Sequence, residues 1–88
     1  MNITGFYYLH ENGDLIYKPH ADLYDMDSPF VKRYWPARAF GATPQVFLDN
    51  LKSAMKSGAK ESEVRRLINF NNLEEYIPDC WEQVGISK

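Results

Sequence analysis

The hydrophobic pattern near the N-terminus predicts a β-hairpin. Residues 6–19 contain two runs rich in aromatic and aliphatic side chains, and Asn12-Gly13 lies between them. Asn-Gly is a strong short-range signal for a hairpin, because both residues tolerate the positive φ that a two-residue type I′ turn requires. Pairing outward from such a turn places Tyr8 opposite Tyr17.

The two faces of this hairpin are both largely apolar. Side chains alternate between faces along each strand, and we expect the face with Phe6, Tyr8, Leu15 and Tyr17 to meet the core, because the other face ends in Lys18. A three-residue loop with a bulge would shift the register and invert this assignment. A lone hairpin is marginal in water, so the downstream helices are needed to cover it.

Two stretches with helical spacing follow. Thr43 is a suitable cap for a helix over 44–57, with proline at its first position and Gly58 as its C-terminal stop. Its predicted buried stripe consists of Phe47, Leu48, Leu51, Ala54 and Met55. A second helix is expected over about 60–71, with acidic residues in its first turn. Its predicted buried face consists of Val64, Leu67 and Ile68.

Shorter elements complete the chain. Ser28 is expected to cap a short helix over 29–35, because Pro36 then ends it. Residues 37–42 are predicted to form either a third strand or an extended connector. Residues 73–77 are expected to form a single helical turn.

We therefore predict one α+β domain spanning 1–88: an N-terminal β-hairpin, with a third strand as an option, packed against two main α-helices and shorter helical turns.

Asn72 is the expected cap of the last helical turn. Trp81 is expected to pack on the core, and 79–88 is expected to form a loosely ordered tail.

Composition narrows the class of protein. A chain of 88 residues that is 44% hydrophobic and 15% aromatic can form one small core, which excludes a disordered protein. The single cysteine, Cys80, excludes an internal disulfide and fits a reducing cytoplasm. No apolar run reaches the roughly 18 residues of a membrane span. We therefore expect a cytoplasmic protein that does not associate with membranes.

Charge is distributed unevenly along the chain. Residues 1–29 carry one Lys and five acids, for −4; residues 30–66 carry eight Lys or Arg and three acids, for +5; residues 67–88 carry one Lys and four acids, for −3. A basic middle can be a binding face. Alternatively, the segments pack together and their charges cancel. Lys32 and Arg33 share one side of the segment before Pro36 and belong to the basic middle.

The junction of the two long helices has the spacing of a helix-turn-helix unit at about 47–70. Its small and apolar anchors are Ala54, Gly58, Ala59, Val64 and Leu67. In a DNA-binding regulator, phosphates or base edges would be contacted by Lys60, Ser62, Arg65 and Arg66. Ser53 and Ser57 occupy positions that are usually apolar in this motif. Glu61 and Glu63 would face phosphate. Both of these features count against the DNA-binding interpretation.

The motifs of enzymes are missing from the sequence. It has no glycine-rich phosphate loop, no Cys/His metal spacing and no nucleophile elbow. We therefore expect no enzymatic activity, no cofactor and no bound metal.

Two blocks resemble a known group of sequences. Residues 8–18 read Tyr-Leu-His-Glu-Asn-Gly-Asp-Leu-Ile-Tyr-Lys, and 28–35 read Ser-Pro-Phe-Val-Lys-Arg-Tyr-Trp. Together with Gly58-Ala59, they resemble small phage- and prophage-encoded proteins of uncharacterised function. The resemblance covers about 7–68 and implies a viral or integrated-viral origin, but no activity.

These observations favour a small accessory protein that binds a macromolecule, with a host or viral protein as the expected partner. The alternative is the DNA-binding regulator, whose partner is duplex DNA. Self-association into a homodimer is a further option, because an uncovered hairpin edge can pair across a two-fold axis.

Overall fold

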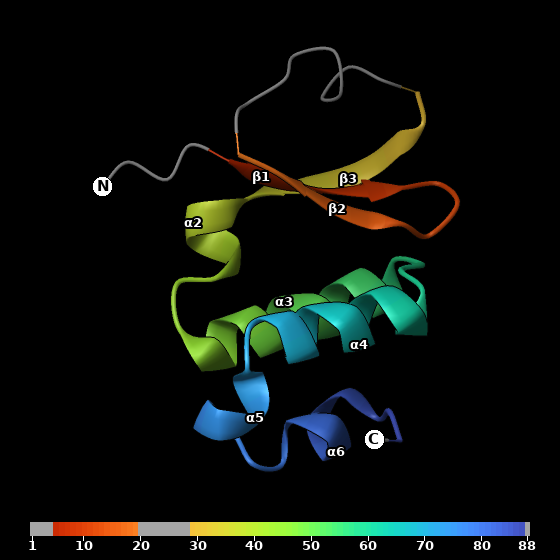
Figure 1. The fold of residues 1–88 in the computed structure, drawn as a ribbon. Helices are drawn as coiled ribbons and strands as arrows, with labels where there is room; N and C mark the ends of the chain where they lie inside the picture. The colour runs from red at the N-terminus through yellow and green to blue at the C-terminus, as the bar shows by residue number, and fades with distance from the viewer. Residues whose placement is uncertain (1–4, 20–28, 88) are drawn as a thin grey trace.

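The computed structural model describes residues 5–19 and 29–87. In these ranges the chain has the predicted α+β architecture, with a three-stranded antiparallel sheet and five helices. Its elements are β1 (Phe6–His10), β2 (Leu15–Lys18), β3 (Val31–Pro36), α2 (Ala37–Phe40), α3 (Pro44–Lys56), α4 (Glu61–Phe70), α5 (Leu73–Tyr76) and α6 (Cys80–Val84). Figure 1 shows the sheet as one layer, α3 and α4 as the next, and α5 and α6 beyond them.

The predicted hairpin is confirmed, but its turn is longer than expected. The N–H of His10 donates to the carbonyl of Asp14 at 2.9 Å, and the N–H of Gly13 donates to the carbonyl of His10 at 3.0 Å. Gly13 has a φ of +95°, whereas Asn12 does not have a positive φ. This geometry is a three-residue loop with a glycine bulge, not a two-residue type I′ turn.

The longer loop changes the register by one residue. β1 pairs with β2 as Tyr7↔Tyr17 and Leu9↔Leu15, so the predicted pairing of Tyr8 with Tyr17 is wrong. A one-residue shift moves every side chain of a strand to the opposite face. Tyr7 and Leu9 therefore belong to the core cluster, together with Leu15, which was assigned to the core face correctly.

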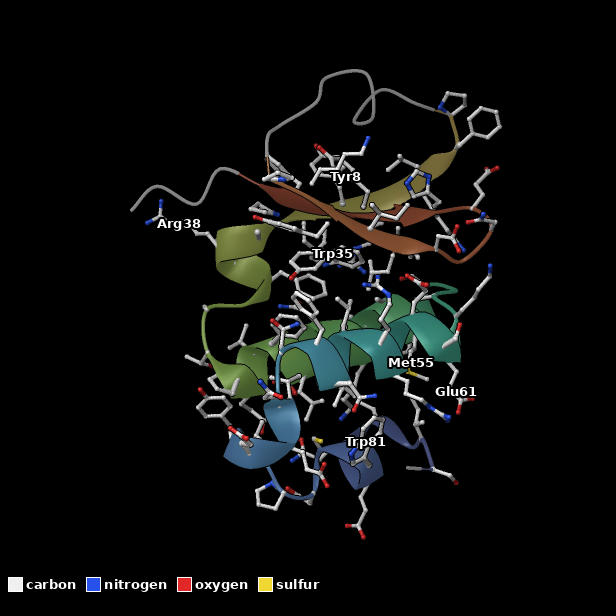
Figure 2. The ribbon with its side chains drawn as sticks, viewed as in Figure 1. Tyr8, Trp35, Arg38, Met55, Glu61 and Trp81 are labelled. Carbon is white, nitrogen blue, oxygen red and sulfur yellow. The ribbon has the colours of Figure 1, made fainter. Side chains whose placement is uncertain are left out.

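The other face of the sheet carries the remaining aromatic side chains of β1. Phe6 and Tyr8 lie there beside Tyr34 of β3, with ring centroids 5.9 and 6.3 Å from the ring of Tyr34. Figure 2 shows Tyr8 on this outer face and Trp35 between the sheet and the helices. The prediction that Phe6 and Tyr8 contact the helices is therefore wrong.

The segment predicted as a helix over 29–35 is instead the third strand. β3 pairs with β1 on the edge opposite β2, giving the order β2-β1-β3. Residues 31–36 form a strand because β1 is central in the sheet, and a strand on its second edge satisfies the backbone hydrogen-bonding groups that β2 leaves unpaired. The aromatic residues of β3 also suit a sheet. The predicted cap, Ser28, lies outside the described residues.

Residues 37–42, predicted as a strand or connector, contain the short helix α2. Pro36 precedes it in an extended conformation, and the N–H of Gly41 donates to the carbonyl of Ala37 at 2.9 Å. The turn places Phe40 in the core, fully buried. Its ring stacks on Tyr7, with centroids 4.3 Å apart, and meets Phe47 of α3 edge-on at 5.3 Å.

The two long helices are confirmed. The hydroxyl of Thr43 accepts the N–H of Val46 at 3.1 Å, which caps α3 as expected. Gly58 follows α3 with a φ of +111°. The buried residues of the two helices are Phe47, Leu48, Leu51, Ala54, Val64, Leu67 and Ile68. Met55 is partly buried against the same core.

The C-terminal segment also contributes to the core. Asn72 occupies the N-cap position of α5, as predicted, but it is in the left-handed conformation (φ 53°) and its side chain makes no capping hydrogen bond. Trp81 is buried, as expected. The stretch predicted to be a loosely ordered tail contains α6, and Ile86 after it is only 4% exposed.

Candidate interaction surface

The sequence singled out six polar residues as a binding surface, and Lys60 is the first of them. It joins the hairpin turn to the turn between α3 and α4: its backbone N–H donates to the carbonyl of Gly13 at 3.0 Å, and its Nζ lies 3.0 Å from Oδ1 of Asp14. This contact holds two turns together that are far apart in the sequence. Lys60 therefore has a structural partner within the chain.

The same contact affects the titration of Asp14. The hydrogen bond from Lys60, with a second from Asn12, holds the pKa of Asp14 below its ordinary value. Because the folded-state pKa is depressed, the contact stabilises the fold above the unfolded-state pKa and is lost as the pH falls through the folded-state pKa.

We expect Lys60→Met to raise the pKa of Asp14 toward its ordinary value, because the strongest donor to the carboxylate is removed. An NMR titration of the Asp14 side chain measures this directly. Arg65→Met is the matched control, since Arg65 contacts other residues, and it should leave the titration unchanged. Equal titration curves in wild type and Lys60→Met would show that this contact is not formed in solution.

Arg66 acts with Glu63 at the edge of the sheet. Its guanidinium donates to Glu63 Oε2 at 2.9 Å and to the carbonyl of Leu15 at 3.1 Å, and the N–H of Leu15 donates to the same Glu63 oxygen at 3.3 Å. Both backbone groups of Leu15 on the outer edge of β2 are thus bound by side chains of α4. At this position α4 occupies the edge to which another strand would pair.

Arg65 and Ser62 lie on the outward face of α4. The guanidinium of Arg65 donates to Glu61 at 2.9 Å and to the carbonyl of Ser87 at 3.1 Å, which links α4 to the C-terminal segment. Ser62 is exposed. These two residues line an open hollow of about 460 Å³ along α4, whose other lining residues are Glu61, Arg66 and Asn69.

Lys32 and Arg33 lie at the C-terminal end of α3. Arg33 donates to the hydroxyl of Ser57 at 3.4 Å, and its guanidinium carbon is 4.6 Å from the ring centroid of Trp35. Lys32 Nζ lies 3.3 Å from the position that a Cβ on Gly58 would occupy. Cations near a helix C-terminus are favourable because the helix dipole is negative there.

The ion pairs on α4 can be compared with what a DNA-recognition helix requires. Arg65 and Arg66 each share their charge with a glutamate of the same helix, so this face carries little net charge. In Figure 1, α4 runs back alongside α3. Binding to DNA depends on cations that can neutralise phosphates, so this arrangement gives the duplex-DNA interpretation no support.

Two exposed aromatic side chains were not singled out from the sequence. Phe70, the last residue of α4, is 78% exposed, and Tyr76, the last residue of α5, is 66% exposed. The helical pattern contained the signal for Phe70, because it lies off the stripe that contains Val64, Leu67 and Ile68. Phe70 lies four residues after Arg66, which lines the hollow along α4, so these two side chains are neighbours on the surface of the helix.

The described residues contain few features suited to chemistry. They bury no charged side chain and include no group of three His, Cys, Asp or Glu that could hold a metal ion. Cys80 is fully buried, and burial raises the pKa of its thiol, which favours the unreactive protonated form. The open hollow along α4 and the exposed rings of Phe70 and Tyr76 are therefore the candidate site among the described residues.

Comparisons with protein families, curated proteins and solved structures found no match for this chain. In the part of the chain that the structure describes, no helix has the length and apolar character needed to cross a membrane.

Proposed function

We propose that this chain is a small accessory protein without enzymatic activity that binds another protein through the outward face of α4 and the adjacent α5. The observation that carries the proposal is the exposure of Phe70, which at 78% is the most exposed large apolar side chain among the described residues. Tyr76, on the next helix, adds a second exposed ring.

The chemistry of this surface suits a protein partner. Aromatic side chains dominate the binding energy of many protein interfaces, where they fill pockets and are surrounded by polar contacts. Beside Phe70, the hollow along α4 offers hydroxyl, amide and paired charged groups from Ser62, Asn69 and Arg65. Such groups can form the polar rim around an aromatic anchor.

The proposed origin is a phage or prophage, and the proposed partner is a host or viral protein. This part of the proposal rests on the resemblance of the hairpin block and the Ser-Pro-Phe-Val block to small phage-encoded proteins. The partner should therefore be sought in an infected host cell.

We expect Phe70→Ser to weaken binding to the partner by at least about tenfold, because an interface loses its aromatic anchor. Affinity purification of the tagged chain from the host, with mass spectrometry, identifies the partner, and calorimetry then compares the variants. Phe30→Ser is the matched control, since Phe30 is also strongly exposed, at 66%, but lies by the hairpin turn. It should bind as the wild type does.

Three outcomes would contradict the proposal. One is the absence of a captured protein, and another is equal capture by Phe70→Ser and the wild type. The third is a mobility shift of duplex DNA by micromolar protein at low salt, which would favour the DNA-binding regulator instead.

A further inference from the structure

A second hollow, of about 270 Å³, lies between α3 and α6 and is lined by Lys52, Met55, Lys56 and Val84. We call it the α3–α6 hollow. Its three residues from α3 are spaced by three and four positions, which brings them to one side of that helix. Met55 is partly buried and Val84 is 8% exposed, so these two form an apolar floor. The two lysines provide its charged groups.

The charge of this hollow is unbalanced. It has no carboxylate in its lining, and neither Lys52 nor Lys56 forms an ion pair within 5–19 and 29–87. The carboxylate of Asp49, on α3, and that of Asp79, just before α6, accept hydrogen bonds from glutamine amides instead. An occupant that brings its own negative charge would therefore complement the site.

We propose that the α3–α6 hollow binds a segment of the partner protein in which an apolar side chain is flanked by carboxylates. The apolar side chain contacts Met55 and Val84, and the carboxylates accept hydrogen bonds from Lys52 and Lys56. Methionine adapts its shape to different apolar groups, and charge-assisted hydrogen bonds are stronger than neutral ones. This inference rests on the proposed function, since it takes the occupant to belong to that partner.

The lining favours a peptide over other ligands. The volume is below the roughly 300–1,000 Å³ of sites for cofactors and drug-sized molecules. Among the described residues no aromatic ring lines the hollow, which gives nucleic-acid bases no ring there on which to stack. Two lysines are also fewer than the clusters of about four to eight that recognise anionic lipids.

The experiment is an NMR titration of the ¹⁵N-labelled full chain with three synthetic peptides. The first alternates Asp or Glu with Leu and Phe, the second replaces the apolar residues by Ser, and the third replaces the acids by Lys. We expect only the first to shift the amide signals of Lys52, Met55, Lys56 and Val84, with a Kd below about 1 mM. The affinity should fall as salt is added.

Lys52→Glu should weaken this binding by roughly tenfold or more, because one charge-assisted contact is replaced by repulsion. Arg38→Glu is the matched control, because Arg38 is exposed and points away from the body of the protein in Figure 2. It should bind the first peptide as the wild type does. The amide spectrum of each variant establishes that it is folded.

The inference is overturned if the first peptide does not bind, if it shifts signals elsewhere, or if the Ser-containing acidic peptide binds equally well. Shifts of the same four signals by a duplex oligonucleotide also overturn it. Capture of a partner that depends on Phe70 but not on Lys52 would leave the proposed function in place without this inference. Binding of the first peptide without any captured partner would show that the α3–α6 hollow binds such a peptide and would contradict the proposed function.

Discussion

Replacing Phe40 with alanine is expected to lower the free energy of unfolding by about 3–5 kcal/mol. The side chain is fully buried, and its ring contacts Tyr7 and Trp35 from the sheet and Phe47 from α3. Phe40 thus lies between rings of the sheet and the ring of Phe47, which Tyr7 also meets at 5.9 Å. Small domains are stable by only about 5–15 kcal/mol, so the variant should be close to unfolding.

Urea unfolding followed by circular dichroism measures this effect. Phe40→Leu keeps most of the buried volume and should cost distinctly less than Phe40→Ala. Phe30→Ala removes the same aromatic group from a side chain that is 66% exposed, and should change the stability by less than about 1 kcal/mol. A loss below about 1 kcal/mol for Phe40→Ala would show that α2 does not place this ring in the core.

The parts of the fold that the sequence predicted correctly depend on local signals. The helix α3 combines a threonine cap, a first-turn proline and an apolar stripe, and each of these lies within the helix or next to it. The existence of the hairpin was predicted for the same reason, from Asn12-Gly13. Its register was not, because a two-residue and a three-residue loop both accept Gly13 at a positive φ. Only the contacts of the finished sheet decide between the two loops.

β3 and α2 were misassigned because their structure depends on distant residues. In isolation, the apolar positions of Val31, Tyr34 and Trp35 fit a short helix as well as a strand. The free edge of β1 decides in favour of the strand, and no local pattern indicates that edge. The helix that follows places Phe40 against Tyr7, a contact between residues more than thirty positions apart.

For the candidate surfaces too, local contacts could be predicted from the sequence and contacts between distant segments could not. The pairs Glu61–Arg65 and Glu63–Arg66 have helical spacing and could be read from the sequence, which would have lowered the expected charge of α4. The contacts of Arg66 with Leu15 and of Lys60 with Asp14 could not, because they join distant segments. The α3–α6 hollow was also beyond reach, since it forms only when α6 packs on α3.

The hairpin turn provides the second large expected effect. Gly13→Ala should lower the free energy of unfolding by at least about 2 kcal/mol, because two costs combine. The backbone has a φ of +95°, which a side chain disfavours, and the new Cβ would lie 2.8 Å from Cγ of Lys60 and 3.0 Å from the carbonyl oxygen of Gly58. The second of these neighbours is backbone and cannot move without shifting the turn between α3 and α4.

Gly85→Ala is the control that separates the two costs. Gly85 also has a positive φ, of +74°, but a Cβ there would meet no atom within 4 Å, so only the conformational cost of about 1 kcal/mol is expected. The difference between the two variants measures how closely the hairpin turn approaches the helical layer. If Gly13→Ala moves the two turns apart, the pKa of Asp14 should also rise, because the contact with Lys60 is lost. Equal stability losses, with an unchanged Asp14 titration, would mean that the hairpin turn is not held against α4.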